Sequence, residues 1–194
     1  MGGRKMESNV LRYDRVRREI KDGDILLYKA KGLLRSGFLP TLVQLVTRSP
    51  YSHAGFAAWW NERLMVMEAI GNGVIVNPLS LSLERYHATV KWWCCREEIP
   101  DGKRLEMILY AQKELGKSYA ALLAFWFMIK MLFVGNFDKN DCFREETSLY
   151  CSQFVAQAYN KVGLDLKKER SDRYMSPNDI ARSKLLVYQG TLQR

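Results

Sequence analysis

Three apolar stretches between residues 53 and 79 constrain the fold of this chain more than any other feature. They are "HAGFAAWW" (53–60), "RLMVMEAI" (63–70) and "VIVNPL" (74–79), and the short polar segments "NE" and "GNG" separate them. Short apolar runs joined by two or three turn-forming residues are typical of antiparallel strands connected by hairpins. The sequence therefore predicts a three-stranded antiparallel meander over these residues.

Further strands and helices flank this meander, and together they predict an α+β fold. Additional strands are indicated by "DGDILLYKA" (22–30), "ATVKWWCCR" (88–96) and "LLVYQG" (185–190). Helical patterns are indicated over 103–116 and in the segment that holds Cys151 and ends near Gly163. A further helix is indicated after Ser176, because Ser176 is a favoured N-cap residue and Pro177 would take the first helical position. We therefore expect an antiparallel sheet or barrel packed against helices.

The length of the chain favours one domain. A chain of 194 residues, 47% of them hydrophobic, is long enough to bury a core and short enough that one domain is the default. Charged and apolar residues alternate with helical spacing over 8–20. We expect an N-terminal amphipathic helix within 1–20 and a single folded domain over 21–194.

A strongly apolar run covers residues 119–134 and is interrupted only by Lys130. As a helix, these 16 residues would span about 24 Å, less than the roughly 30 Å of a bilayer's hydrocarbon core. A buried helix or a pocket wall is favoured over a membrane span, and a peripheral membrane contact through this run stays open as an alternative.

The net charge of +9 comes from 30 Lys and Arg residues against 21 acidic residues, spread along the chain. Such a spread usually belongs to a solvated surface, although it also suits anionic partners. Because no nucleic-acid fingerprint or Arg-rich recognition helix is present, we expect no nucleic-acid partner. The sequence does not indicate an oligomeric state.

The cysteines indicate free thiols rather than a disulfide framework or a metal centre. There are four, at positions 94, 95, 142 and 151, without a C-x-x-C motif, and the first 24 residues lack the apolar core of a secretory signal. We expect a cytoplasmic protein without a cofactor. Neighbouring Cys94 and Cys95 on a strand point to opposite faces and make poor joint ligands, so no metal site is expected.

Cys151 lies in "SLYCSQFVAQAY" (148–159), near the start of a predicted helix. With Thr147 or Ser148 as the N-cap, it would take the third or fourth helical position. Free cysteine is one of the most buried residue types, so a core role is a strong alternative. The first turn of a helix, however, stabilises a thiolate through unpaired N–H groups and the helix dipole, and this favours a nucleophile.

A nucleophilic thiol needs a base, and the chain contains only two histidines. His53 begins an apolar strand, whereas His87 lies in a polar stretch and is best interpreted as a loop residue. If the hairpin closes at "NE", Gly55 pairs with Glu68 and places Glu68 on the same face as His53, at the diagonal position. A carboxylate inside "LMVMEAI" needs a partner, and His53 is the nearest candidate; a solvated Glu68, or one paired with Lys or Arg, remains open.

The chain resembles a known family, the circularly permuted NlpC/P60 cysteine peptidases of the YiiX/YebB type, which are relatives of papain. The resemblance covers most of residues 21–190 and rests on six segments in the order of that family: "DGDILLY", "SPYSHAGFA", "VMEAIGNGVIVNPL", "GKSY", "YCSQFVAQAY" and "SPNDIARS". It implies a permuted papain-like fold. The chain departs from the family at Ala120, where an Asp often follows the Tyr, and in its long apolar run.

The resemblance also implies roles for individual residues. It makes Cys151 the nucleophile, His53 the base and Glu68 the group that orients His53. Residues beside the oxyanion or the substrate would be Tyr150, Tyr51 and Ser52. Asp24, in "GDI", is interpreted as a structural turn carboxylate.

We therefore expect a thiol hydrolase that cleaves an amide through a thioacyl-enzyme. The expected substrate is a small peptide or amide, such as a cell-wall-derived fragment. One alternative is an acyltransferase or lipid-acting thiol hydrolase on a related permuted fold, with the apolar run as an acyl-binding wall. Another is a non-catalytic binding domain in which Cys151 is part of the core.

Overall fold

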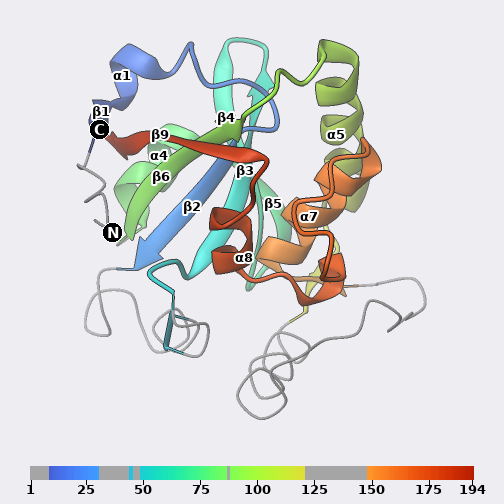
Figure 1. Ribbon diagram of the computed structural model, residues 1–194. Coiled ribbons are helices and arrows are strands. Elements are labelled where there is room, and N and C mark those ends of the chain that lie inside the picture. The colour runs from blue at the N-terminus through green and yellow to red at the C-terminus, as the bar shows by residue number, and fades with distance from the viewer. Residues whose placement is uncertain (1–8, 31–43, 46–48, 87, 121–147) are drawn as a thin grey trace, which may run out of the picture.

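A seven-stranded sheet with helices on both faces dominates the computed structural model (Figure 1). The structure describes residues 9–30, 44–45, 49–86, 88–120 and 148–194. The first half of the chain holds β1 (Val10–Arg12), α1 (Tyr13–Val16), β2 (Ile25–Ala30), β3 (His53–Trp60), β4 (Arg63–Ile70), β5 (Gly73–Pro78), α4 (Leu79–Arg85) and β6 (Ala88–Cys95). The second half holds α5 (Asp101–Glu114), β7 (Ser118–Tyr119), β8 (Ser148–Leu149), α7 (Cys151–Lys161), a 3-10 turn (Asp172–Tyr174), α8 (Pro177–Ala181) and β9 (Leu186–Gln193).

The strands of the large sheet run in the order β1-β9-β6-β2-β3-β4-β5. All neighbouring pairs are antiparallel except β1 and β9, which are parallel. A separate parallel pair is formed by β7 and β8. The mixed α+β class and the antiparallel sheet packed against helices are as the sequence predicts.

The predicted meander is formed by β3, β4 and β5 with the expected register. Trp60 pairs with Arg63 and Gly55 pairs with Glu68, so the two-residue turn closes at Asn61 and Glu62. Asn61 has a φ of 52°, the left-handed conformation that such a tight turn requires. This register places His53 and Glu68 on the same face of the sheet.

Each face of the sheet buries its own apolar core. On one face α7 packs against β3 and β4 and α5 packs against α7, and the Phe154 ring stacks on Phe56 with centroids 5.2 Å apart. On the other face α4 contributes Leu79 to a second cluster that includes Leu64 and Val66. Figure 1 shows α5 and α7 beside the sheet, with β1 and β9 at its opposite edge. The sheet is therefore sandwiched, and its middle strands are buried on both sides.

The N-terminal segment differs from the predicted single helix. Val10–Arg12 is a strand, β1, and the helix that follows contains only Tyr13–Val16. The strand pairs with β9, and a Cβ on Gly190 would lie 2.4 Å from Leu11 Cδ1, so this glycine allows the close approach. Pairing with a strand distant in the sequence outweighed the local helical pattern.

The structure can be compared with two further predictions, the helix or pocket wall over the apolar run and the N-cap of α7. Residues 121–147, and with them most of 119–134, lie outside the described residues. In the part of the chain that the structure describes, no helix is long and apolar enough to cross a membrane. The N-cap of α7 is Tyr150, so Cys151 is the first helical residue rather than the third or fourth.

Candidate active site

The Cys151 side chain lies at the N-terminus of α7 and is buried. The apolar residues behind it in the helix, among them Phe154 and Val155, are fully buried and hold this end of α7 against the sheet. Burial alone would raise the pKa of the thiol, but the nearby charge of His53 and its hydrogen bond outweigh this and lower the pKa. Backbone N–H groups of Ala54 and Ser152 lower it further, so this sulfur favours the thiolate.

His53 lies between Cys151 and Glu68. Its Nε2 is 2.7 Å from Glu68 Oε2, and the ring lies close enough to Cys151 for each group to shift the other's pKa. Because Nε2 is occupied by the carboxylate, Nδ1 is the ring nitrogen available to the sulfur. Burial disfavours the imidazolium, yet the charges and hydrogen bonds of Cys151 and Glu68 raise the pKa of His53 to about 10. The sequence-based pairing of His53 with Glu68 is thus confirmed.

Glu68 is completely buried and is held by more than His53. Asn77, on the neighbouring strand β5, donates from Nδ2 to Glu68 Oε1 at 3.4 Å. Burial raises the pKa of Tyr86, and the charge of Glu68 and a hydrogen bond to it raise that pKa further. A Cβ at Gly55 would lie 3.2 Å from Glu68 Cβ and 2.9 Å from Met67 O, so glycine leaves room beside this carboxylate.

Two tyrosines enclose the imidazole of His53. The Tyr86 ring stacks on it at a centroid distance of 6.0 Å and an interplanar angle of 10°, and the Tyr28 ring lies 5.0 Å away in a tilted arrangement. Negative ring faces beside the imidazole favour its charged form and restrict its rotation. Tyr86 therefore contacts both members of the His53–Glu68 pair.

Sequence reasoning did not identify Asn77 and Tyr86 as part of this site. Asn77 carried a usable signal, since it is a polar residue in the apolar stretch "VIVNPL" at a strand position near Glu68. Tyr86 carried none, because it follows α4 in a polar segment and reaches the site only through the fold. Both residues support the carboxylate rather than the sulfur.

Tyr119 brings the beginning of the apolar run to the sulfur. Burial raises the pKa of its phenol, and the charge of Cys151 adds to the effect. The two-stranded pairing of β7 with β8 fixes this arrangement, because it joins Tyr119 to Leu149, two residues before Cys151. Ala120, which is buried, donates its N–H to Leu149 O at 3.0 Å.

The other three expected site residues lie beside Cys151 or His53 in the chain, and each forms a hydrogen bond that holds its segment in place. Ser52 donates its hydroxyl to Tyr28 O at 3.3 Å and its N–H to the same oxygen at 2.9 Å. Tyr51 is buried, and its N–H donates to Ser49 Oγ. Tyr150 is buried and donates its hydroxyl to the carbonyl oxygen of Arg173. Tyr51 and Ser52 thus fix the chain entering His53, and Tyr150 ties the start of α7 to the 3-10 turn.

Within the described ranges, no group of three or more His, Cys, Asp or Glu side chains is arranged so that it could hold a metal ion. Cys94 accepts a hydrogen bond from Gln189 Nε2 at 2.9 Å, while Cys95 packs against the core on the α7 side. Cys94, Cys95 and Cys151 are all free thiols. Asp24, away from the sulfur, binds the backbone N–H of Lys21 and the indole of Trp92, as expected of a structural carboxylate.

A cysteine at the start of a helix, facing a strand histidine that a carboxylate holds, defines the class of papain-like thiol hydrolases. Comparison with known families specifies the class further. Residues 19–187 match the family of permuted papain-like amidase enzymes, YaeF/YiiX, C92. The chain belongs to this family and is a cysteine peptidase or amidase-type hydrolase.

A solved structure supports the same fold. The crystal structure of metalloprotein YiiX from Escherichia coli O157:H7 matches with a TM-score of 0.66 and 18% sequence identity, covering 90% of this chain and 99% of that one. At this identity the likeness establishes the fold alone. No curated protein matched the sequence.

Proposed function

We propose that this protein hydrolyses an amide bond through a thioacyl intermediate, with Cys151 as nucleophile, His53 as general base and acid, and Glu68 orienting His53. The observation that carries the proposal is the position of His53, whose Nε2 is 2.7 Å from Glu68 Oε2 and whose ring lies close enough to Cys151 for the two groups to shift each other's pKa in opposite directions. A cysteine that served only as core filler would need neither partner.

The opposite pKa shifts of Cys151 and His53 supply the reactive form of the pair. The pKa of the thiol is lowered and that of the imidazole is raised to about 10, so the thiolate–imidazolium pair is the resting state near neutral pH. The thiolate attacks the carbonyl carbon and forms a C–S bond. As the C–N bond breaks, His53 donates its proton to the leaving amine.

Hydrolysis of the thioester regenerates the pair. Neutral His53 removes a proton from water, the resulting hydroxide attacks the thioester carbonyl, and the C–S bond breaks to release the acid and the thiolate. The backbone N–H of Cys151 is a natural donor to the oxyanion, because the first N–H groups of a helix lack partners within the helix. Tyr150, Tyr51 and Ser52 stay proposed neighbours of the oxyanion or substrate.

The proposed substrate is a small peptide or amide, such as a cell-wall-derived fragment, in a cytoplasmic setting. The family's amidase description supports the amide, and the free thiols of Cys94, Cys95 and Cys151 suit a reducing compartment.

A second candidate is an acyltransferase or lipid-acting thiol hydrolase that uses the same side chains. The observation in its favour is that the first residues of the apolar run, partly buried Tyr119 and buried Ala120, lie close to Cys151. An acyl chain bound along this run would end at the nucleophile. Contact of residues 119–134 with a membrane belongs to this alternative.

The deciding experiment captures the intermediate and identifies the acceptor. The enzyme is incubated with a panel of short peptides and N-acyl amides, and in parallel with phosphatidylcholine vesicles, and is quenched in acid for peptide mass spectrometry. We expect an acid-stable acyl adduct on Cys151 from an amide substrate, and its absence in Cys151→Ser and in His53→Ala.

The acceptor separates the two candidates. Release of free acid and amine from an amide substrate, with water as the acceptor even when another amine is present, supports the hydrolase. Adducts and fatty-acid release only from vesicles, or transfer to an added amine in preference to water, support the lipid-acting alternative. An enzyme whose turnover of the panel is unchanged in Cys151→Ser contradicts both. Cys94→Ser is the matched control, since that thiol lies away from the site.

A further inference from the structure

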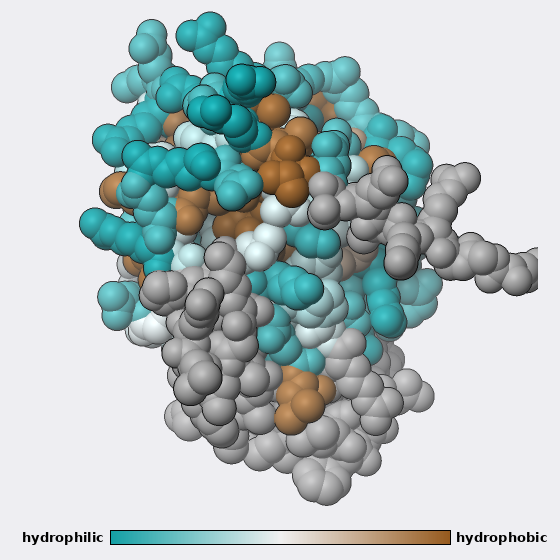
Figure 2. All heavy atoms as spheres, turned by 90° about the vertical axis from the view of Figure 1, so that its left-hand side faces the viewer, coloured by the Kyte–Doolittle hydropathy of each residue, from teal (hydrophilic) through white to brown (hydrophobic). Residues whose placement is uncertain are grey.

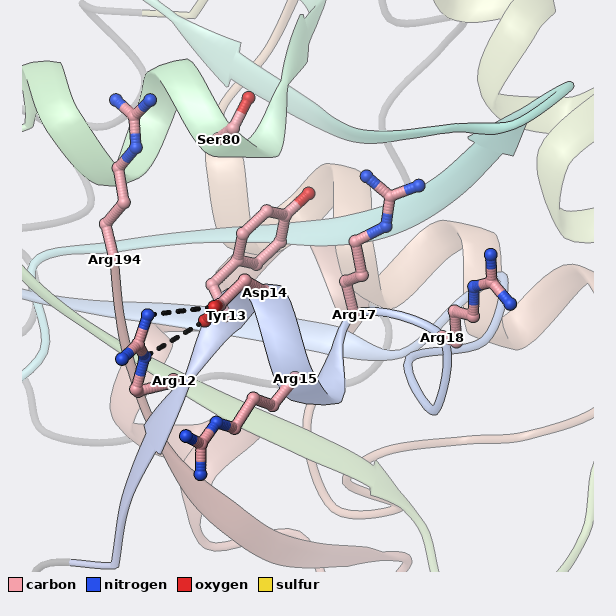
Figure 3. A pocket seen from close by; sticks show the side chains of 8 residues that line it. All are labelled: Arg12, Tyr13, Asp14, Arg15, Arg17, Arg18, Ser80 and Arg194. Carbon is pink, nitrogen blue, oxygen red and sulfur yellow. Dashed lines mark hydrogen bonds and ion pairs between the residues drawn. The ribbon is translucent and has the colours of Figure 1, made fainter.

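Far from Cys151, a cavity of about 690 Å³ lies between α1, α4 and the end of β9. In the part of the chain that the structure describes, its charged lining comprises Arg12, Arg15, Arg17, Arg18 and Arg194, with Asp14 as the one carboxylate (Figure 3). Figure 2, which views the molecule from this side, shows hydrophilic side chains gathered over the upper part of the face, where α1 lies. Positive charge is thus concentrated around a hollow.

Among the described residues, the cationic side chains that line this cavity are all arginine, although the whole chain has 16 Arg and 14 Lys. A surface that only needed positive charge for solubility would contain both. The guanidinium group is planar and presents N–H donors in a fork that matches two oxygens of a phosphate, whereas lysine offers a point charge. The residue type therefore indicates recognition of an oxyanion.

The fold holds part of this lining in place. Pairing of β1 with β9 sets Arg12 opposite Gln193 and so brings Arg194 beside the first strand. The Arg17 guanidinium lies 5.9 Å from the Trp59 ring centroid and donates to Glu62 O at 3.3 Å. A site whose side chains are already positioned loses less entropy when a ligand binds.

Hydroxyl groups add uncharged donors to the cavity. Figure 3 shows the Tyr13 side chain between the arginines, with its hydroxyl directed toward the side where Ser80 and Arg17 lie. Among the described residues, neither the Tyr13 nor the Ser80 hydroxyl has a hydrogen-bond partner in the protein, and Tyr13 itself is buried. Both can donate to a ligand oxygen.

The existing ion pairs leave the arginines available. Arg12 makes two hydrogen bonds to Asp14, at 3.2 and 2.9 Å, but both side chains are more than half exposed, and such pairs contribute little. Arg194 pairs with Glu84, also at the surface. Within the described part of the chain, exposed Arg15 and Arg18 make no ion pair or hydrogen bond.

We propose that this cavity is a binding site for a phosphate group, carried by a soluble organic phosphate or by a lipid headgroup. Five guanidinium groups facing one carboxylate provide the charge, the hydroxyls of Tyr13 and Ser80 provide further donors, and the volume suits a phosphate with an organic substituent. The site shares no residue with the Cys151–His53–Glu68 group, so it is separate from the proposed hydrolysis.

Titration calorimetry on Cys151→Ala tests this site without any turnover. The probe is sodium pyrophosphate at constant ionic strength, and the second arm is sedimentation with vesicles of phosphatidylcholine, with and without phosphatidic acid. We expect binding of at least one probe, reduced about tenfold or more in Arg15→Ala/Arg18→Ala. Asp14→Asn should tighten binding, because it releases Arg12 and removes the cavity's carboxylate.

The matched control is Arg182→Ala/Lys184→Ala, which removes the same charge from exposed positions outside the cavity. Pyrophosphate binding lost only in the cavity variant identifies a soluble phosphate ligand, and binding restricted to phosphatidic acid vesicles identifies a headgroup. The proposal is overturned by no binding of either probe, by equal losses in the two double variants, or by citrate competing as well as pyrophosphate. Unfolding temperatures of all variants exclude misfolding as the cause.

Discussion

Two buried carboxylates, Asp24 and Glu68, each lie next to a cationic side chain, yet they serve different purposes. Asp24 Oδ1 is 3.4 Å from Arg104 Nη1, and its Oδ2 accepts hydrogen bonds from Trp92 Nε1 at 2.8 Å and from the Lys21 N–H at 3.1 Å. Burial raises the pKa of Asp24 in spite of these partners. Arginine does not lose its proton, so this cluster can only hold the structure together.

Glu68 differs because its partner is a histidine. The imidazole of His53 exchanges a proton within an accessible pH range, and its other side faces a thiol. Burial, hydrogen bonding and opposite charge are similar at the two carboxylates. In the proposed mechanism, therefore, a buried ion pair becomes reactive because its partner titrates and a nucleophile lies beyond it.

Removal of His53 is expected to have the largest effect. In His53→Ala the thiol loses its base and the cation that lowers its pKa, and kcat/KM should fall about 10²- to 10⁴-fold. Alkylation by iodoacetamide at pH 7 should slow to the rate of an ordinary thiol. Steady-state kinetics and timed alkylation measure the two effects, with His87→Ala as the control that should change neither.

Glu68→Gln should lower kcat about 100-fold while the protein stays folded, because the amide still fills the site but no longer favours the imidazolium. The measurement is kcat together with the unfolding temperature. If the variant loses stability but keeps its activity per folded molecule, Glu68 only stabilises the structure, as Asp24 does.

Asp24→Asn should show the reverse pattern. Asp24 accepts hydrogen bonds from Trp92, Arg104 and the Lys21 backbone. The amide of asparagine would turn an N–H donor toward at least one of these donors and leave it unpaired, so the free energy of unfolding should fall by about 2 kcal/mol. Urea unfolding measures the loss. Activity per folded molecule should stay at the wild-type level, and a drop in kcat without loss of stability contradicts the comparison.

The raised pKa of His53 predicts an upper limit of the active pH range. Because His53 must be protonated to serve the leaving amine, kcat/KM should fall about tenfold per pH unit as the pH rises through about 10. The lowered pKa of Cys151 should keep the rate high well below the pKa of an ordinary thiol. A decline that begins near pH 7 would mean that His53 is not coupled to the thiolate.

Tyr86→Phe should have the smallest effect, about a threefold loss in kcat. Phenylalanine keeps the stacking on His53 but removes the hydrogen bond to Glu68. A positioning role predicts that the upper limb of the pH profile shifts to lower pH and that Tyr86→Leu is more damaging than Tyr86→Phe. Equal stability losses with an unchanged pH profile would show that the ring only fills space.

The sequence was informative wherever local pattern determines structure. The turn at Asn61 and Glu62 defined the hairpin register, and the register brought Glu68 to His53. Ser176 and Pro177 marked the start of α8, and a capping box with Asp179 confirms it. Catalytic roles for Cys151, His53 and Glu68 stay predictions, but their proximity followed from residue spacing and from the rarity of histidine.

Features that depend on distant contacts could not be predicted. Val10–Arg12 looks helical by local spacing and becomes a strand only because β9 lies beside it. Tyr86 reaches His53 through the packing of α4, which no sequence period reveals. The start of α7 was placed too early, because Ser148 and Leu149 pair with β7 instead of beginning the helix.

The position of β9 has a consequence for synthesis of the protein on the ribosome. Although β9 follows all the other described strands of the sheet in the sequence, it lies between β1 and β6 inside the sheet. Until it emerges, the edge of β6, with Trp92 and Trp93, has no neighbour on that side, and β1 has no partner in the sheet. A nascent chain therefore exposes an unpaired, aromatic strand edge until β9 has been translated, which makes this edge the natural place for a chaperone to act.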